Sequence, residues 1–387
     1  MKIKSVKAAI VEGNFDWMLI RIDTDEGLTG FGECYSSHYS AEIKQFVSTL
    51  SKELLGQSPY NIARLTHKMS LGNTSGYGVN AISGIEMALW DLVGKALDQP
   101  IHVLLGGSHR DEVKIYADCH AGESISSLET YGGDYESYTP EAYAKNAKNI
   151  ERKGYSLLKF DFYPGFPGPG NKKIVSPLSK ADLKHCAEIV ACVRGSIKDE
   201  TGLALDLGGG YTVTDAIRLG KIFEPFNLEW MEDPVPGNNI DAFAQVTNNT
   251  STPVMCSYTQ LRNTRQLCRE LIVKQAARIL AIDFGNIGGL QEGRKITDLA
   301  ELYFIPIATH NIASPVGTIA AAQVSSTMPN FVACENHSLA VPWWENLIKE
   351  KQVIQKGYYK LNQKPGLGIE LDEKEVVKHL KEGDNFF

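Results

Sequence analysis

The sequence predicts an α/β fold, in which a barrel of parallel strands and helices of the TIM type follows a small α+β domain. From about residue 113, eight short strand-like segments alternate with amphipathic helical stretches. Polar or ionisable residues gather at the C-terminal ends of these strands. Alternating strands and helices are typical of a parallel sheet, and eight such units indicate a barrel. The alternative is an open doubly wound sheet, but no G-x-G-x-x-G motif follows the first strand, which disfavours its dinucleotide-binding form.

The N-terminal part is expected to be an α+β domain, because three strand-like runs precede two helical patterns. The strand-like runs cover residues 3–13, 16–25 and 27–35, and the helical patterns cover 41–56 and 79–97. A turn is expected around residues 25–27, and Gly56 is the expected C-cap of the first helix. We predict that residues 1–112 form this domain, that 113–344 form the barrel, and that 345–387 return to the first domain.

The predicted barrel places a group of ionisable residues at one rim. Its strands are expected at residues 113–119, 156–161, 203–207, 228–232, 253–257, 278–283, 304–309 and 331–335. Seven ionisable residues stand at or near their C-terminal ends: Lys159, Asp161, Asp206, Glu232, Asp283, His310 and Glu335. Any one of them could be a helix cap, an ion-pair partner or a hydrogen-bonded core residue. Seven at the end of the barrel where active sites lie favour a catalytic mouth.

Composition excludes several classes of function. The net charge of −7, without a run of Lys or Arg, argues against a nucleic-acid-binding surface. No apolar run approaches the roughly 18 residues that a membrane span needs, and the N-terminus lacks the apolar core of a secretory signal. The seven cysteines form no CxxC pair and are odd in number, which indicates reduced thiols in a cytoplasmic protein.

The rim residues indicate chemistry at a carbon next to a carboxylate. Asp206 and Glu232 end neighbouring strands and offer the hard oxygen ligands that Mg²⁺ prefers. Such a metal could polarise a substrate carboxylate and stabilise an enediolate. Asp283 and His310 also end adjacent strands, so the aspartate could orient the imidazole as a general base.

Three further rim residues complete this prediction. Lys159 and Asp161 have side chains on the same face of one strand, so they could do acid–base work from the other side of the substrate. Glu335 could hydrogen-bond to the substrate carboxylate. The expected partner is therefore a small carboxylic acid.

The chain resembles the enolase superfamily, in its mandelate racemase/muconate lactonizing enzyme-like branch, and most of all the sugar-acid dehydratases typified by galactonate dehydratase. The resemblance covers nearly the whole chain and rests on segments such as GLTGFGECY, LLKFDFYPGF, LALDLGGGYT, EWMEDPVP, LAIDFGNIGGLQEGRKI, PIATHNIASPVG and MPNFVACEN. It implies an α+β capping domain over a (β/α)₇β barrel, a Mg²⁺ cofactor, removal of the proton α to a carboxylate, and a homo-oligomer. It also implies that Asp206 and Glu232 bind the metal, that Asp283 and His310 form the base dyad, and that Glu335 lies beside the substrate carboxylate.

Two positions depart from the family pattern. The third metal ligand should be a glutamate, yet the spacing of 26 residues that separates Asp206 from Glu232 leads next to Tyr258. A phenol with a pKa near 10 is a poor Mg²⁺ ligand, so the site is either weakened or completed by water, Ser257 or Thr259. The second departure is Gly208, where the sugar-acid dehydratases often carry a histidine that expels the hydroxide.

These departures leave several functions open. Tyr211 and His120 are candidate substitutes for the missing acid, and His120 is also a candidate substrate contact. A sugar-acid dehydratase is the first expectation. A racemase or epimerase would need no departing hydroxide and could use Lys159 on the second face. A catalytically inactive binding or regulatory member is the remaining alternative.

Substrate specificity is expected to come from loops that close over the barrel mouth. Residues 12–17 offer Asn14, Phe15 and Asp16, and residues 34–40 offer Tyr35, Ser36 and His38. Of these, Asn14, Tyr35 and His38 are the predicted substrate contacts. The Pro- and Gly-rich insertion 163–179 is a further lid or a loop that contacts a neighbouring subunit.

Overall fold

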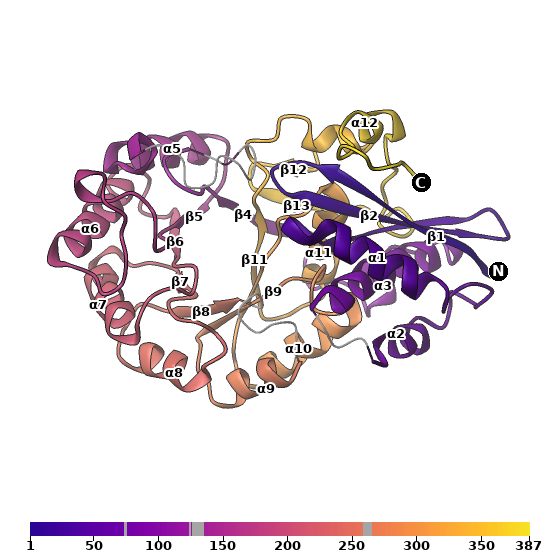
Figure 1. The fold of residues 1–387 in the computed structure, drawn as a ribbon, viewed down its shortest axis with the longest axis horizontal. Helices are drawn as coiled ribbons and strands as arrows, with labels where there is room; N and C mark the ends of the chain where they lie inside the picture. Colours follow the sequence, from indigo (N-terminus) through magenta and orange to yellow (C-terminus); the bar gives the residue numbers. More distant parts are fainter. Residues whose placement is uncertain (73–75, 124, 126–134, 258–264) are drawn as a thin grey trace.

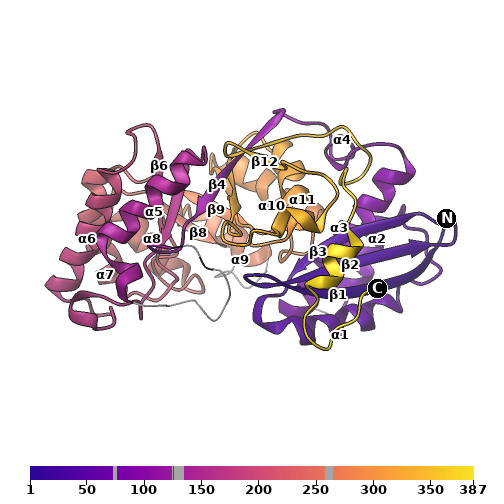
Figure 2. The same cartoon turned by 90° about the horizontal axis from the view of Figure 1, so that it is seen from above.

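The computed structural model describes residues 1–72, 76–123, 125, 135–257 and 265–387. An N-terminal antiparallel sheet lies beside a barrel of parallel strands (Figures 1 and 2). The predicted α/β fold with an N-terminal cap is therefore confirmed. Within the described residues, no helix combines the length and the apolar character that crossing a bilayer requires.

The N-terminal sheet has the order β1-β2-β3 and packs on a long helix, α3. Its strands are β1 (Ile3–Glu12), β2 (Asp16–Thr24) and β3 (Thr29–Tyr35), and its helices are η1 (Ser37–Tyr39), α1 (Ser40–Ser51), α2 (Ile62–Ser70), α3 (Gly76–Ala96) and α4 (Ile101–Leu104). Gly30 and Gly32 allow the close approach of β3 to α3, because a Cβ at either position would lie 2.3 Å from a carbonyl oxygen of that helix.

One helix of this domain differs from the prediction. Helix α1 ends at Ser51 and not at Gly56. Gly56 has the left-handed backbone expected of it (φ 74°), but its N–H donates to the carbonyl of Ile3 at 2.8 Å. The helix therefore ends five residues before this glycine, whose N–H is hydrogen-bonded to the first strand.

Among the described residues, eight parallel strands form the barrel, and β11 closes it by pairing with β4. They are β4 (Glu112–Asp118), β5 (Leu157–Asp161), β6 (Gly202–Asp206), β7 (Trp230–Glu232), β8 (Val254–Ser257), β9 (Ile279–Ile282), β10 (Ile307–Thr309) and β11 (Phe331–Asn336). The helices between them are η3 (Tyr135–Tyr138), α5 (Pro140–Arg152), η4 (Pro169–Asn171), α6 (Lys180–Arg194), α7 (Val213–Phe223), η5 (Glu224–Phe226), α8 (Ile240–Asn248), α9 (Arg265–Val273), α10 (Leu290–Leu302) and α11 (Pro315–Ser326).

The strand register decides which side chains share the mouth. Asp161 pairs with Asp206 across β5 and β6, and Asp206 pairs with Glu232 across β6 and β7. Three acidic residues therefore stand at one level. The barrel interior is filled by a separate apolar cluster that combines large residues such as Tyr116 and Trp230 with several alanines, so the polar site lies above a packed floor.

The C-terminal segment packs against the first domain (Figure 2, where its yellow helix lies near β1). It contains η6 (Trp344–Leu347), β12 (Ile354–Gln355), β13 (Tyr358–Lys360) and α12 (Glu373–Lys378). The N–H of Glu12 donates to the carbonyl of His379, and the N–H of Lys381 donates to the carbonyl of Ile10, both at 2.9 Å. The segment also extends the barrel sheet, because β13 pairs with β4; the division at residues 112 and 344 stays a proposal.

Two buried acids of the cap hold it on the barrel. Glu86 of α3 accepts the N–H groups of Leu290 and Gln291 at the start of α10, at 2.8 and 3.1 Å. Glu33 of β3 accepts the N–H groups of Ser314 and Gly317 at the start of α11, both at 2.9 Å. A helix start presents unpaired N–H groups and positive potential, which carboxyl groups satisfy. The cap is thereby anchored beside the strands that carry Asp283 and His310.

Candidate functional site

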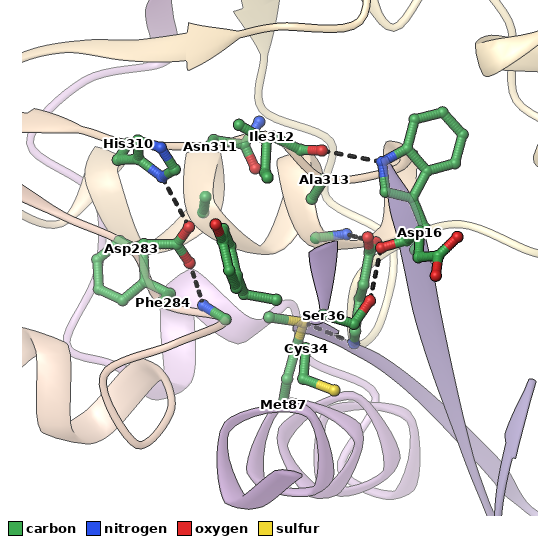
Figure 3. A pocket seen from close by; sticks show the side chains of 16 residues that line it. Asp16, Cys34, Ser36, Met87, Asp283, Phe284, His310, Asn311, Ile312 and Ala313 are labelled. Carbon is green, nitrogen blue, oxygen red and sulfur yellow. Dashed lines mark hydrogen bonds and ion pairs between the residues drawn. The ribbon is translucent and has the colours of Figure 1, made fainter. Parts of the chain in front are cut away.

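Asp283 and His310 meet at the barrel mouth directly after β9 and β10. Their Oδ2 and Nδ1 atoms lie 2.8 Å apart, and the N–H of Gly285 donates to Asp283 Oδ1 at 2.7 Å, which orients the carboxylate (Figure 3). Burial alone would lower the pKa of His310, but Glu335 and Asp283 outweigh it and raise this pKa to about 9. The pair has the geometry of an oriented general base.

Glu335 joins the dyad to the rest of the mouth. Its side chain is fully buried, its Oε2 accepts the N–H of Asn311 at 2.9 Å, and the same oxygen lies 3.8 Å from His310 Nε2. Its Oε1 lies 2.6 Å from Lys159 Nζ. His310 is therefore flanked by Asp283 at one nitrogen and faces Glu335 with the other.

Lys159 lies at the centre of the mouth. Its Nζ is 3.2 Å from Asp118, 3.6 Å from Asp206, 3.1 Å from Glu232 and 2.6 Å from Glu335, and its side chain is 1% exposed. Burial alone would lower the pKa of Lys159, but the carboxylates raise it well above its ordinary value. The lysine is therefore a fixed ammonium and not the neutral amine that a base requires.

Asp206 and Glu232 have the donor chemistry of a magnesium site. Their carboxylate oxygens converge from adjacent strands on one cationic point, Lys159 Nζ, and both side chains are buried. Burial raises the pKa of both carboxyl groups, and the positive charge of Lys159 opposes this shift. In the described residues, no three His, Cys, Asp or Glu side chains are grouped to hold a metal ion. Mg²⁺ often binds through one or two carboxylates and keeps several waters, so the two residues fit this ion.

The expected third metal ligand follows β8 (Val254–Ser257) in the sequence. Tyr258 and Thr259 lie outside the described residues. Ser257 ends β8 and is hydrogen-bonded to Asp233. The Ser257 N–H donates to the Asp233 carboxylate at 2.7 Å, and the Ser257 hydroxyl donates to the same carboxylate. The serine is therefore directed toward a neighbouring acid that the sequence analysis did not single out.

Tyr163 fills the space next to Gly208. A Cβ built on Gly208 would lie 2.6 Å from the Tyr163 ring, and this glycine has a left-handed backbone (φ 63°). The Tyr163 hydroxyl donates to Asp206 Oδ2 at 3.0 Å. A larger side chain at position 208 would therefore clash with Tyr163, which lies in the loop after β5.

His120 and Asp161 form a second histidine–carboxylate pair. His120 Nδ1 lies 2.7 Å from Asp161 Oδ2, and Asp161 Oδ1 is buried without a hydrogen-bond partner among the described residues. Burial, together with Asp118 and Asp206, raises the pKa of Asp161 well above its usual value, and burial lowers that of His120 to about 4. Burial therefore favours the uncharged form of both groups, which suits a proton donor.

The other predicted contacts have different positions. Tyr35 lies beside the base, with its ring centre 6.3 Å from that of His310. Asn14 is fully buried and donates to the carbonyl of His337 at 2.9 Å. Of His38, the structure describes the backbone in η1 and not the side chain. Tyr211 is buried and donates to the carbonyl of Phe162 at 2.7 Å, which is a packing role.

The remaining residues of the two predicted loops contact protein groups. Phe15 packs edge-on against the His337 ring, with centres 5.0 Å apart. Asp16 accepts from Ser40 and pairs with Lys381, both at 2.5 Å. With Ser36 and Asp283, Asp16 lines a pocket between the cap and the base dyad (Figure 3).

Asp118 and His337 were missed by the sequence analysis. Asp118 ends β4, and its Oδ2 lies 3.4 Å from His337 Nε2, which follows β11. Burial alone would raise the pKa of Asp118, but His337 and Lys159 hold it below its usual value. The rule that polar strand ends face the mouth would have found Asp118, whereas no local signal marks His337.

Comparison with known protein families decides the assignment. Residues 142–375 match the family described as enolase C-terminal domain-like, and residues 6–106 match the mandelate racemase/muconate lactonizing enzyme N-terminal domain. The chain belongs to the enolase superfamily.

Its superfamily relatives include enzymes named as sugar-acid dehydratases. D-xylonate dehydratase of Haloferax volcanii is 38% identical, with 100% of this chain and 90% of the relative covered. D-gluconate/D-galactonate dehydratase of Picrophilus torridus is 28% identical, covering 95% and 89%.

Solved structures of the superfamily agree with this assignment. The mandelate racemase/muconate lactonizing enzyme-like protein from Rubrobacter xylanophilus is 36% identical and superposes with a TM-score of 0.92, covering 100% of this chain and 99% of that one. A superfamily member from Salmonella Typhimurium is 26% identical, with a TM-score of 0.87 and coverage of 97% and 98%.

Proposed function

We propose that this enzyme is a sugar-acid dehydratase: it removes the proton α to the carboxylate of a polyhydroxy acid and expels the β-hydroxyl as water. The observation that carries the proposal is the pairing of His310 with Asp283 on one side of the mouth, opposite the carboxylates of Asp206 and Glu232. The sugar-acid dehydratases among the relatives support the same reaction.

Each group then has a defined task. His310 takes the α proton on Nε2, because its Nδ1 is directed at Asp283. Asp206 and Glu232 would hold Mg²⁺, which when bound supplies the positive charge that stabilises negative charge developing on the substrate carboxylate. Glu335, held by the Asn311 N–H, lies beside the base.

The leaving hydroxyl needs a proton, and Asp161 is the proposed donor. Its carboxyl group, whose pKa is raised by burial, stands level with Asp206 on the neighbouring strand. His120 Nδ1 lies 2.7 Å from Asp161 Oδ2, so the neutral imidazole can pass its Nδ1 proton to the carboxylate while its Nε2 takes up a proton from water. This pair would replace the acid that Gly208 lacks.

A racemase or epimerase is less well supported. That reaction needs a second base on the opposite face, and Lys159 was the candidate. Because four carboxylates surround its ammonium group and raise its pKa, Lys159 does not accept a proton at neutral pH. The dehydratase needs a proton donor in the mouth, which matches the pKa of Asp161 that burial, Asp118 and Asp206 raise.

The function is tested by incubating the wild type with Mg²⁺ and D-xylonate, D-gluconate or D-galactonate in D₂O. We expect one of these acids to yield the 2-keto-3-deoxy acid, detected by NMR and by its 2-keto group. Epimerised substrate with C2 deuterium and no keto product would show the racemase or epimerase instead. Binding of an acid without exchange or product would show the catalytically inactive alternative.

Asp161→Asn should separate the two halves of the reaction. We expect keto-acid formation to fall by about 10²- to 10⁴-fold, since a positioned acid is lost, while exchange of the C2 proton with D₂O continues because the base is intact. NMR measures both on the same sample. Asp199→Asn, at an exposed position, is the control. Equal losses of exchange and product would contradict the role of Asp161 as the acid.

A further inference from the structure

The strongest unassigned feature is the contact of one lysine with four strands of the barrel. Lys159 reaches Asp118 of β4, Asp206 of β6, Glu232 of β7 and Glu335 of β11, at 2.6 to 3.6 Å. All four carboxylates are buried, and so is the ammonium group. A pure acid–base role does not require a lysine that touches four carboxylates of the mouth.

The charges of this cluster are unequal. The four carboxylates face one lysine, and the imidazoles nearest to them are His337 at Asp118 and His310 at Glu335, at 3.4 and 3.8 Å. Asp206 and Glu232 are the two acids without a histidine at such a distance in the described residues, so Lys159 is the cation nearest to both. Buried charges of one sign destabilise a fold unless they are paired. The ammonium group thus supplies to Asp206 and Glu232 part of the positive charge that a bound cation would supply.

We propose that Lys159 is an internal cation that shares Asp206 and Glu232 with Mg²⁺. It keeps the metal-free mouth assembled, and it lowers the affinity for Mg²⁺ by competing for the same carboxylates and by repelling the ion. The inference rests on the proposed function in one respect, namely that Asp206 and Glu232 hold the metal.

The competition has a defined geometry. Lys159 approaches Glu335 more closely than it approaches Asp206, at 2.6 against 3.6 Å. When Mg²⁺ binds, the ammonium can keep its contacts with Glu335 and Asp118 while its contacts with Asp206 and Glu232 weaken. Lys159 is then a positioning residue whose effect is measured on metal binding and on the stability of the metal-free protein.

Lys159→Met tests this, because methionine keeps much of the length and removes the charge. Calorimetry should give a Kd for Mg²⁺ lower by about tenfold or more than that of the wild type, since one repulsive charge is gone. In EDTA the variant should melt below the wild type, and Mg²⁺ should raise its Tm more than it raises that of the wild type. Lys184→Met, on an exposed lysine of α6 that is 78% exposed, should change neither quantity.

A second pair of variants tests the proposal if Lys159→Met alone does not fold. Glu335→Gln removes a carboxylate that would lose its ammonium partner in Lys159→Met and that is not a proposed metal ligand. The double variant Lys159→Met/Glu335→Gln is therefore compared with Glu335→Gln alone. The double variant should again bind Mg²⁺ about tenfold tighter. A Kd unchanged or raised on removal of the lysine would overturn the proposal.

The outcomes separate this inference from the proposed function. If the wild type dehydrates a sugar acid and Lys159→Met binds Mg²⁺ no tighter, only the competition is wrong. If neither the wild type nor any variant binds Mg²⁺, the metal site of the proposed function is wrong, and the competition is wrong with it.

Discussion

His310→Asn is expected to lower kcat/KM for sugar-acid dehydration by about 10³-fold or more, because the variant keeps a polar side chain but loses the base. Exchange of the C2 proton with D₂O should be lost to the same extent. That loss distinguishes this variant from Asp161→Asn, which keeps the exchange. His67→Asn, on a helix of the cap outside the mouth, should behave like the wild type. A His310 variant that still exchanges the C2 proton would contradict the assignment of the base.

The titration of His310 gives an independent check without substrate. In the metal-free protein its pKa is raised to about 9 by Glu335 and Asp283 despite burial, so only about one imidazole in a hundred is neutral at pH 7. The neutral base form, and any rate that depends on it, should therefore increase as the pH rises toward 9. The protonated form stabilises the fold below the unfolded pKa of about 6.5, and this stabilisation is lost as the pH rises through 9. Asp283→Asn should lower the pKa, which heteronuclear NMR of the ring nitrogens measures.

Asp206→Asn and Glu232→Gln are each expected to weaken Mg²⁺ binding by about 10²-fold or more, since each removes one of two proposed carboxylate ligands. Dehydration should fall with metal occupancy, and excess Mg²⁺ should restore part of it. Calorimetry measures the affinity, and the keto-acid assay measures the activity. Asp118→Asn is the matched control, because it removes a buried carboxylate that also contacts Lys159 and is not a proposed ligand.

Tyr258→Glu extends the same measurement. If position 258 corresponds to the third ligand of the family, the added carboxylate should raise Mg²⁺ affinity above that of the wild type. An unchanged affinity would mean that the residue does not reach the metal, and that water or another group completes the shell. If both Asp206→Asn and Glu232→Gln still bind Mg²⁺ as the wild type does, the cation binds elsewhere.

The fold and the outline of the mouth were predictable from local pattern. Each barrel strand is a short apolar run that ends in a polar residue, and parallel strands bring such ends to one rim. Asp206 and Glu232 stand side by side because their strands are neighbours in sequence and in the sheet. The same reasoning applies to Asp283 and His310, which the structure brings to 2.8 Å.

Contacts across the barrel could not be predicted from the sequence. Lys159 was predicted to do acid–base work, yet its ammonium is held by carboxylates from four strands, two of which, β7 and β11, are not neighbours of its own. Asn14 was predicted to contact substrate and instead binds the carbonyl of His337, 323 residues away. Tyr163 occupies the space above Gly208 because a loop folds back over the rim.

The sequence by itself determined which residue types end each strand, and therefore the family of chemistry that the mouth can perform. The tertiary structure alone decided which of those groups are charged, because a pKa depends on burial and on the charges nearby, and both are set by closure of the barrel. The raised pKa of Asp161 and the raised pKa of Lys159 follow from that closure, since neither shift is a property of the residue type or of its neighbours in the chain.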